Sequence, residues 1–353
     1  PYRRQRQMCI RDRFLSLGAG TILSGVGVAD ALMQPAKTYL QIVGGFCILN
    51  ALIPICSSYL RAFGFSKEPL YASIIGNVIN FCLNAFFLFV LHKGVAGVAT
   101  ATVISRIINL VIVVLLGAVL VKAKQHPERE SNRAVMGQII RIGLPSACET
   151  AIYNVSMTLV IRFLNQMDAQ GLNVTARSYT MQITNFSYCV GAALAQANAI
   201  MTGWHIGAKE YDACDRGTRK AAIIGVIVAV ILETMFALCS GWIMQLFSKD
   251  PQMVSLVGKL LAIDIVLEMG RVTNLVYGQA LKTSGDAVFP VVMGACFMIL
   301  CSVGGTYLFG IRLGLLAVGA YIGMAGDECV RAVGMYLRWK SGKWKEKGLV
   351  KSR

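Results

Sequence analysis

Two ten-residue stretches decide the fold: residues 60–69 read LRAFGFSKEP, and residues 281–290 read LKTSGDAVFP. Each has a cation at its second position, a glycine three residues later and a proline five residues after the glycine. Each also lies between two apolar runs of helix length. The offset is 221 residues (281 − 60), and it also relates Leu40 to Leu261 and Ile42 to Ile263. Because solenoid units span only about 20–50 residues, this offset predicts a duplicated helical bundle.

The composition places this bundle in a membrane. The 353 residues are 56% hydrophobic and only 15% charged, whereas soluble domains average about 25% charged. Uncharged runs cover residues 38–60, 69–91, 178–204 and 287–311, and about 20 apolar residues of helix cross a bilayer. We therefore predict an all-α polytopic membrane protein. In such proteins a duplicated bundle is common among secondary transporters, whose substrate site lies between the repeats.

The formal net charge of +16 raises the question of nucleic acid, but the placement of the charges argues against it. Lys and Arg gather in alternate connections between apolar runs: Arg61 and Lys67, five between 122 and 141, four between 209 and 220, Lys282, and the tail after 338. This alternation follows the positive-inside rule. It predicts a cytoplasmic C-terminus in the cell membrane, with a basic tail that is either solvated or in contact with anionic lipid.

The chain divides by composition into five segments. Residues 7–12 (QMCIRD) correspond to the translated end of a transposon adapter used in sequencing libraries, so we expect residues 1–13 to be an artefact; a short basic leader is the alternative. We expect a partial first lobe at 14–122, a cytoplasmic linker at 123–137, a second lobe at 138–339 and a basic tail at 340–353. The offset puts the start of the first copy before residue 1 (137 − 221 = −84), which predicts an incomplete first lobe.

Numbered on a twelve-helix scheme, the first lobe would hold the end of helix three and helices four to six, and the second lobe helices seven to twelve. The apolar runs predict these helices at residues 14–28, 36–61, 69–91, 95–122, 138–166, 176–204, 212–247, 251–283, 287–311 and 313–339.

Ionisable residues inside apolar helices are costly and are candidates for function. Glu149 follows Gly143-Leu144-Pro145 near the start of the expected helix seven. Its carboxylate can bind a cation or a proton, or it can be a helix-start acid favoured by the helix dipole. Asp264, Glu268 and Arg271 are spaced four and three residues apart and share one helix face. They form either an exchangeable cluster or a static salt bridge.

Other residues in the expected helices are also candidates. Glu233 lies in mid-helix without a charged partner within four residues, and is either functional or hydrogen-bonded to another helix. Asp327, Glu328 and Arg331 form a similar cluster, which we expect to be structural and towards the membrane interface. Aromatic side chains can provide a wall for a cationic substrate, or can serve only in packing: Tyr153, Phe186 and Tyr188.

The sequence contains no enzyme signature. It lacks HExxH, GxSxG, DDxxD and P-loop motifs, its three histidines are scattered, and its eleven cysteines form no CxxC pair. We therefore predict neither an enzyme nor a cofactor, and no metal site other than Na+ at Glu149, Asp264 and Glu268.

Several short motifs together give the chain a family resemblance. They are the two stretches quoted above, GVAGVA at 94–99, GLP at 143–145, and GAKE at 207–210 followed by Ala213. In their order and spacing they resemble the MATE (multidrug and toxic compound extrusion) transporters. The stretch at 281–290 is similar to the family motif L-R-G-x-G-D…P, with Lys-Thr-Ser in place of Arg-Gly-x. The resemblance extends over nearly all of the chain after residue 13.

The resemblance implies two six-helix lobes and export of cationic or amphipathic compounds in exchange for Na+ or H+. It also implies that acidic residues on helices seven and ten take part in this exchange, and the matching residues here are Glu149, Asp264 and Glu268. Our candidate site further includes Arg271, Glu233 and Tyr153. We expect a monomer in the lipid bilayer. The alternatives are a flippase for lipid-linked oligosaccharides, which would favour a basic cavity, and, more remotely, an intramembrane enzyme.

Overall fold

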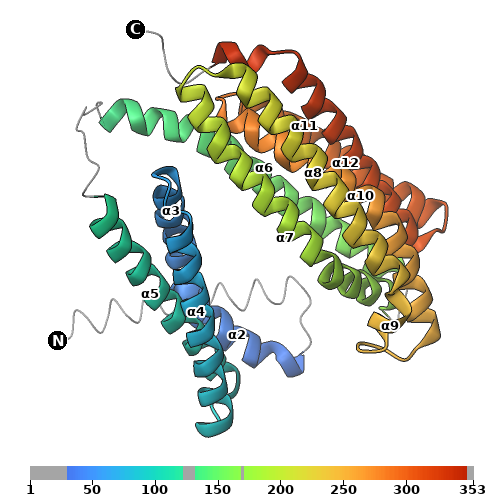
Figure 1. Cartoon of the computed structure of the whole chain (residues 1–353). Coiled ribbons are helices and arrows are strands. Elements are labelled where there is room, and N and C mark those ends of the chain that lie inside the picture. Colours follow the sequence, from blue (N-terminus) through green and yellow to red (C-terminus); the bar gives the residue numbers. More distant parts are fainter. Residues whose placement is uncertain (1–29, 122–131, 168–170, 348–353) are drawn as a thin grey trace. The chain divides into compact units, whose positions relative to one another are not determined.

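The computed structural model describes residues 30–121, 132–167 and 171–347, and in these ranges it contains helices and no strand. The chain divides into two compact units, unit 1 (Pro1–Glu128) and unit 2 (Arg129–Arg353). Figure 1 labels the helices of both units. The expected adapter segment and the end of helix three lie outside the described residues, as does most of the expected linker.

Unit 1 is built around one long helix. Its elements are α2 (Asp30–Gly45), α3 (Ile48–Ala62), α4 (Lys67–Ala85), the π-helical turn η1 (Phe86–Val90) and α5 (Gly94–Val121). Helix α5 packs against α2, α3 and α4. The buried core is small and consists of Leu60, Ala72, Val113 and Val121. A hydrogen bond from the Asn80 amide to the Ser105 hydroxyl, 3.1 Å long, joins α4 to α5.

The prediction of one helix at residues 36–61 is wrong. The structure has two helices, α2 and α3, bent by 44°. The bend follows Gly44 and Gly45. Adjacent glycines weaken a helix because glycine loses more conformational entropy than any other residue when it becomes helical. Tighter turns bridge the break, with the amides of Phe46 and Cys47 donating to carbonyls three residues earlier at 3.2 and 3.1 Å.

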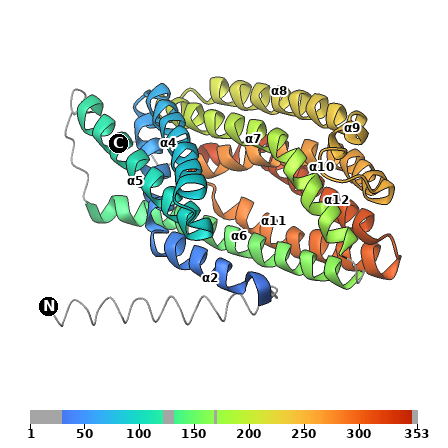
Figure 2. The same ribbon diagram turned by 90° about the horizontal axis from the view of Figure 1, so that it is seen from below.

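Unit 2 holds the remaining helices. They are α6 (Asn132–Met167), α7 (Leu172–Gly207), α8 (Tyr211–Leu238), α9 (Ser240–Met244), α10 (Pro251–Thr283), α11 (Val288–Phe297), the π-helical η3 (Met298–Val303) and η4 (Thr306–Arg312), α12 (Leu316–Lys340) and the 3₁₀ turn η5 (Lys343–Lys347). Helix α10 is central and packs against α7, α8 and α12, while α11 packs against α6 (Figures 1 and 2).

Three further predicted helices are interrupted. The helix expected at 69–91 is α4 followed by the π-helical η1. The helix expected at 212–247 is α8 followed by the short α9, with a break at Cys239. The helix expected at 287–311 begins as α11 and continues with π-helical turns, in which the Leu313 amide donates to the Leu308 carbonyl at 2.9 Å. Wide turns of this kind interrupt α-helices and cannot be read from apolar periodicity.

The predicted repeat recurs in the backbone. Helices α3 and α10 end at residues 221 positions apart, Ala62 and Thr283. Two residues later the chain turns through Gly64 (φ 90°) and Gly285 (φ 92°), a backbone region that favours glycine. In each copy the next amide donates to the carbonyl five residues earlier, at 3.0 and 2.9 Å (Phe65 to Leu60, and Asp286 to Leu281). This is the Schellman arrangement that ends a helix.

The helices divide into apolar and polar groups. Among the described residues, four helices are long and apolar enough to cross a membrane, or five if the bent pair α2–α3 counts as one. Large apolar side chains are exposed on their surfaces, for example Val119 at 72% and Leu238 at 82%. Surfaces of this kind fit a lipid environment. Helices α6, α7, α10 and α12 are less apolar, and they enclose the cavity described below.

The start of the basic tail is packed against unit 2. The Trp344 indole, 1% exposed, stacks on Trp339 with ring centroids 4.2 Å apart. Trp339 in turn donates a 2.8 Å hydrogen bond to Asp215 of α8. Lys343 and Lys345 are exposed. Trp344 therefore holds the start of the tail against α12, and contact of the tail with anionic lipid stays a prediction.

Candidate functional site

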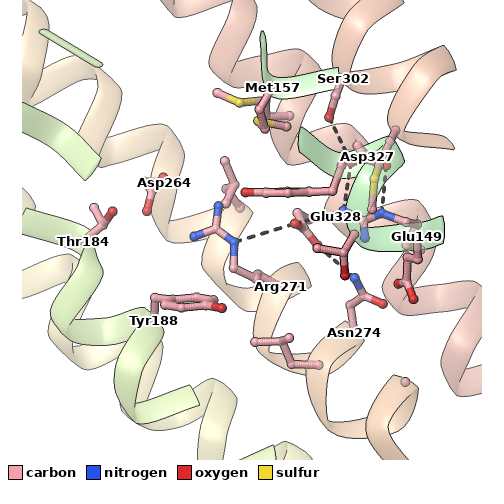
Figure 3. Close-up of a pocket in the computed structure, with 18 of the residues that line it drawn as sticks. Glu149, Met157, Thr184, Tyr188, Asp264, Arg271, Asn274, Ser302, Asp327 and Glu328 are labelled. Carbon is pink, nitrogen blue, oxygen red and sulfur yellow. Dashed lines mark hydrogen bonds and ion pairs between the residues drawn. The ribbon is translucent and has the colours of Figure 1, made fainter. Parts of the chain in front are cut away.

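A cavity of about 450 Å³ lies inside unit 2. Side chains of α6, α7, α10, α11, η3 and α12 line it, and Figure 3 shows its polar centre. Eight of the lining residues are charged: Glu149, Asp264, Asp327, Glu328, Arg177, Arg271, Lys282 and Arg331. Charges inside a membrane protein are costly unless they are paired, so their pairing determines what the cavity can bind.

Helix α10 brings Asp264, Glu268 and Arg271 to one face, as their spacing predicted. The start of the helix is capped by Asp250, which accepts a 3.0 Å hydrogen bond from the Gln252 amide. Pro251 occupies the first helical position, which suits proline. Asp264 is 2% exposed and Glu268 is fully buried. Arg271 donates a 2.7 Å charged hydrogen bond to Glu268. Glu268 is absent from the lining of the cavity.

Gly270 allows α12 to approach α10 closely. A Cβ atom at this position would lie 2.8 Å from the backbone of both Glu328 and Cys329. Beside this contact, Arg271 forms an ion pair with Glu328 at 3.6 Å, and Asn274 donates to Glu328 at 3.1 Å. Figure 3 shows the Arg271 guanidinium between Asp264 and Glu328. The salt bridge expected within α10 is therefore part of a network that spans two helices.

The α12 cluster belongs to the same cavity. Arg331 donates to both carboxylate oxygens of Asp327 at 2.8 Å and forms a 2.9 Å ion pair with Glu328. Ser302 of η3 donates to Asp327 at 2.9 Å. Asp327 and Arg331 are 1% and 4% exposed and line the cavity, while their expected place towards the membrane interface stays a prediction. The close crossing at Gly270 could not be read from local spacing.

Glu149 lies on the opposite side of the cavity from Asp264 in Figure 3. Helix α6 begins at Asn132 and continues through Pro145, so Glu149 is inside the helix and the helix-start alternative is wrong. Lys282, at the end of α10, donates to Glu149 at 2.6 Å. The cation of the second repeated stretch therefore pairs with an acid from α6.

Glu233 lies outside the cavity lining. It is fully buried on α8, and neither of its carboxylate oxygens has a hydrogen-bond partner. Ser187 of α7 interacts with the Glu233 carboxylate, at a geometry outside that of a regular hydrogen bond. Glu233 interacts electrostatically with Asp264 and Glu268, each of which also has one unpartnered oxygen. A proton on any of these acids would reduce their mutual repulsion.

The aromatic residues separate into two groups. Tyr153 and Tyr188 line the cavity, and the Arg271 guanidinium lies 5.9 Å from the centre of the Tyr188 ring. Phe186 is 70% exposed and does not line the cavity. The prediction of an aromatic wall therefore fails for Phe186, because residues two apart on a helix point in different directions.

Arg177 is a cavity residue that the sequence reasoning missed. It is on α7, 7% exposed, and within the described residues it forms no ion pair with a carboxylate. Its Nη2 atom donates only to the Met157 thioether at 3.8 Å, and its buried Nε has no partner. A single arginine near the start of a helix is also typical of a residue at the membrane interface, so its position in the sequence did not indicate a cavity residue.

The acids named for Na+ do not meet at one point. Within the described ranges, no group of three or more His, Cys, Asp or Glu side chains is arranged to hold a metal ion. The lining acids and bases are equal in number, four of each. The cavity is therefore neither basic nor acidic when all eight groups are ionised.

Together, the apolar helices and the buried ionic cavity are typical of a multi-pass membrane protein. A sequence model of the MatE family matches residues 14–86 and 145–308. The chain therefore belongs to the MatE family, whose members are transporters rather than enzymes.

The chain is similar to other proteins over most of its length. "Uncharacterized transporter YisQ" of Bacillus subtilis is 32% identical, over 98% of this chain and 81% of the relative. "Probable multidrug resistance protein NorM" of Thermotoga maritima is 22% identical, over 98% and 78%. The crystal structure of the eukaryotic MATE transporter AtDTX14 matches with a TM-score of 0.86 at 17% identity, over 97% of this chain and 77% of that one. At this identity the structure shows a shared fold.

Proposed function

We propose that the chain is a secondary antiporter that exports cationic or amphipathic compounds in exchange for Na+ or H+. The observation that carries the proposal is the 2.6 Å pair between Glu149 and Lys282 at the cavity wall. The Lys282 ammonium occupies the Glu149 carboxylate, which a cation from outside the protein would otherwise bind. A compound or ion that displaces Lys282 changes the links between α6 and α10, and such differential binding can drive a change of state.

The remaining residues have supporting roles in this proposal. Asp264 and Glu268 carry the coupling cation or proton, and Arg271 exchanges between Glu268 and Glu328 as that charge changes. Glu233, which lies outside the cavity lining, can also bind the coupling proton. Tyr153 provides an aromatic wall for the substrate. The names of relatives such as "Probable multidrug resistance protein NorM" support export of drug-like compounds. We propose a monomer in the cell membrane with a cytoplasmic C-terminus.

The test measures transport of rhodamine 123, a lipophilic cation, into inside-out vesicles that contain the full chain. Accumulation should require an imposed gradient of either Na+ or H+, and each gradient is applied alone. Glu149→Gln and Glu268→Gln should reduce transport at least tenfold, whereas Glu210→Gln, which changes an exposed acid outside the cavity, should leave it within twofold. Absence of transport under both gradients would overturn the exporter proposal.

The same vesicles address the alternative of a lipid-linked oligosaccharide flippase. An anionic pyrophosphate would be favoured by a surplus of lining bases, and the equal numbers of acids and bases give no such surplus. Flipping of a fluorescent polyprenyl-pyrophosphate, in the absence of any rhodamine 123 transport, would favour the flippase.

A further inference from the structure

One end of unit 2 gathers exposed cations from two segments that are far apart in the sequence. Three lie on α8 and three at the end of α12 and in η5, and none forms an ion pair within the described residues. These six residues form the basic rim: Arg216, Arg219, Lys220, Lys340, Lys343 and Lys345. Among the described residues beside them, the exposed acids are Glu210, which pairs with His205, and Asp212. The rim therefore carries a net positive charge.

The outward faces of two helices change from apolar to cationic at the rim. On α8 the three cations are followed, at helical spacing, by side chains that are more than half exposed: Ile223, Ile227 and Ile231. On α12 the order is reversed, and Val333 and Leu337, at 58% and 57% exposure, precede Lys340. Apolar helix faces that end in cations are typical of the boundary between acyl chains and headgroups.

Tertiary contacts hold the tail part of the rim beside α8. Trp344 of η5 is buried and contacts Tyr211, the first residue of α8, with ring centroids 5.9 Å apart. Trp339, on which Trp344 stacks, donates to Asp215 of α8 at 2.8 Å. Figure 1 shows the start of α8 and the end of α12 at the same end of unit 2. The cations of both segments therefore form one surface.

We propose that the basic rim binds the headgroups of anionic phospholipids, while the apolar faces next to it contact their acyl chains. A phospholipid carries its charge directly beside an apolar phase, and the rim has the matching arrangement on two helices. A nucleic acid would match the charge but make no use of the adjoining isoleucines. Each Lys or Arg close to an anionic membrane surface contributes about fivefold in affinity, so the six together favour anionic over zwitterionic lipid. This inference goes beyond the proposed export function and does not depend on it.

The test measures binding of phosphatidylglycerol to the full chain in an uncharged detergent, by the anisotropy of a fluorescent label on one acyl chain. Phosphatidylcholine with the same chains and label is the matched lipid, because its headgroup has no net charge. The unaltered protein should bind phosphatidylglycerol at least tenfold more tightly, and added NaCl should reduce this preference, since salt screens exposed charges. Sodium phosphate in place of NaCl, at equal ionic strength, should change the preference less than twofold.

Two triple variants divide the rim. The first is Arg216→Gln, Arg219→Gln, Lys220→Gln, and the second is Lys340→Gln, Lys343→Gln, Lys345→Gln. Each should weaken binding of phosphatidylglycerol at least fivefold, about the contribution of one cation, and leave phosphatidylcholine within twofold. The matched control is Lys249→Gln, Arg312→Gln, which removes two exposed cations beyond the opposite ends of α8 and α12. It should leave binding of both lipids within twofold.

Trp344→Ala separates a rim assembled by tertiary contacts from a loose basic tail. It keeps all six cations but releases the tail from α8, so binding of phosphatidylglycerol should weaken at least threefold. Unchanged binding in this variant, equal binding of the two lipids to the unaltered protein, or equal losses in the control variant would overturn the proposal. Displacement of the lipid by phosphate would assign the rim to a soluble anion, and tighter binding of single-stranded DNA would assign it to nucleic acid. Each of these results would also overturn it.

Discussion

The two copies of the helix-ending turn have the same backbone and different surroundings. In unit 1 the turn follows α3, and in unit 2 it follows α10. The glycine φ angles are 90° and 92°, and the closing hydrogen bonds are 3.0 and 2.9 Å long. Sequence similarity between the two ten-residue stretches is limited to a leucine, a cation, a glycine and a proline. These few positions are enough to reproduce the turn, because the glycine alone removes the steric cost of positive φ.

The side chains around the turns differ. In unit 2, Lys282 pairs with Glu149 at 2.6 Å, and the buried Asp286 accepts a 2.7 Å charged hydrogen bond from Arg338. In unit 1, Arg61 forms no ion pair with any described residue, and an apolar residue, Phe65, stands at the position of Asp286. The duplication has therefore kept the helix geometry, while only the second copy carries an ionic site in the described residues.

The largest effect is expected where α10 crosses α12 at Gly270. Gly270 corresponds to Leu49 in the first copy (270 − 221). Gly270→Leu should destabilise unit 2 by more than about 3 kcal/mol, because the added side chain meets the α12 backbone. Thermal unfolding in detergent measures the effect. Gly326→Leu on α12, where a Cβ meets nothing within 4 Å, should not lower stability and should raise it by up to about 1 kcal/mol, because leucine favours a helix more than glycine does. Equal effects would contradict a specific close crossing.

Removing the acid of the second turn should have the next largest effect. Asp286→Ala leaves Arg338 without its buried partner and should cost about 2–3 kcal/mol, towards the lower end for a broken pair because the Arg338 side chain is 18% exposed. The double variant Asp286→Ala, Arg338→Leu should recover part of this loss. If the double variant is no more stable than the single one, the ion pair is not the source of the effect.

The glycines test what the two turns share. Gly64→Ala and Gly285→Ala should each cost about 1–2 kcal/mol from backbone strain. A Cβ at Gly64 meets nothing within 4 Å, so no clash adds to the strain there. Matching decreases in the unfolding temperature would support one turn geometry in both copies. A loss at only one glycine would show that the copies have diverged in backbone as well.

The smallest expected effect concerns the two cations. Lys282→Met should tighten binding of rhodamine 123 about tenfold, since the dye no longer competes with an internal ammonium for Glu149. This corresponds to about 1.4 kcal/mol. Arg61→Met at the matching position should change the dissociation constant by less than twofold. Fluorescence anisotropy measures both, and unchanged binding in Lys282→Met would separate Glu149 from the cation site.

Much of the fold follows from the sequence. Helix α10 was predicted at 251–283 and is found at Pro251–Thr283, because Asp250, Pro251 and Gly285 are strong local signals at its ends. The break after Gly45 was missed, since two glycines inside an apolar run also occur in continuous membrane helices.

The site was only partly predictable. The spacing of Asp264, Glu268 and Arg271 places them on one face of any α-helix, and the structure shows that arrangement. That the α12 cluster lines the same cavity was not predicted, and Arg177 was missed, because burial of a charge depends on which helix covers it.

The sequence by itself determined the membrane helices, the 221-residue repeat and the turn that ends α3 and α10. These features are local: hydropathy sets the apolar helices, helical hydrogen bonds join residues four apart, and one glycine permits the turn. The tertiary structure alone decided which charges share the cavity. Lys282 reaches Glu149 across 133 residues of sequence, and Arg271 meets Glu328 where Gly270 lets two helices touch. Such pairs depend on helix crossings, since in a low-dielectric interior only charges in close contact compensate each other's burial.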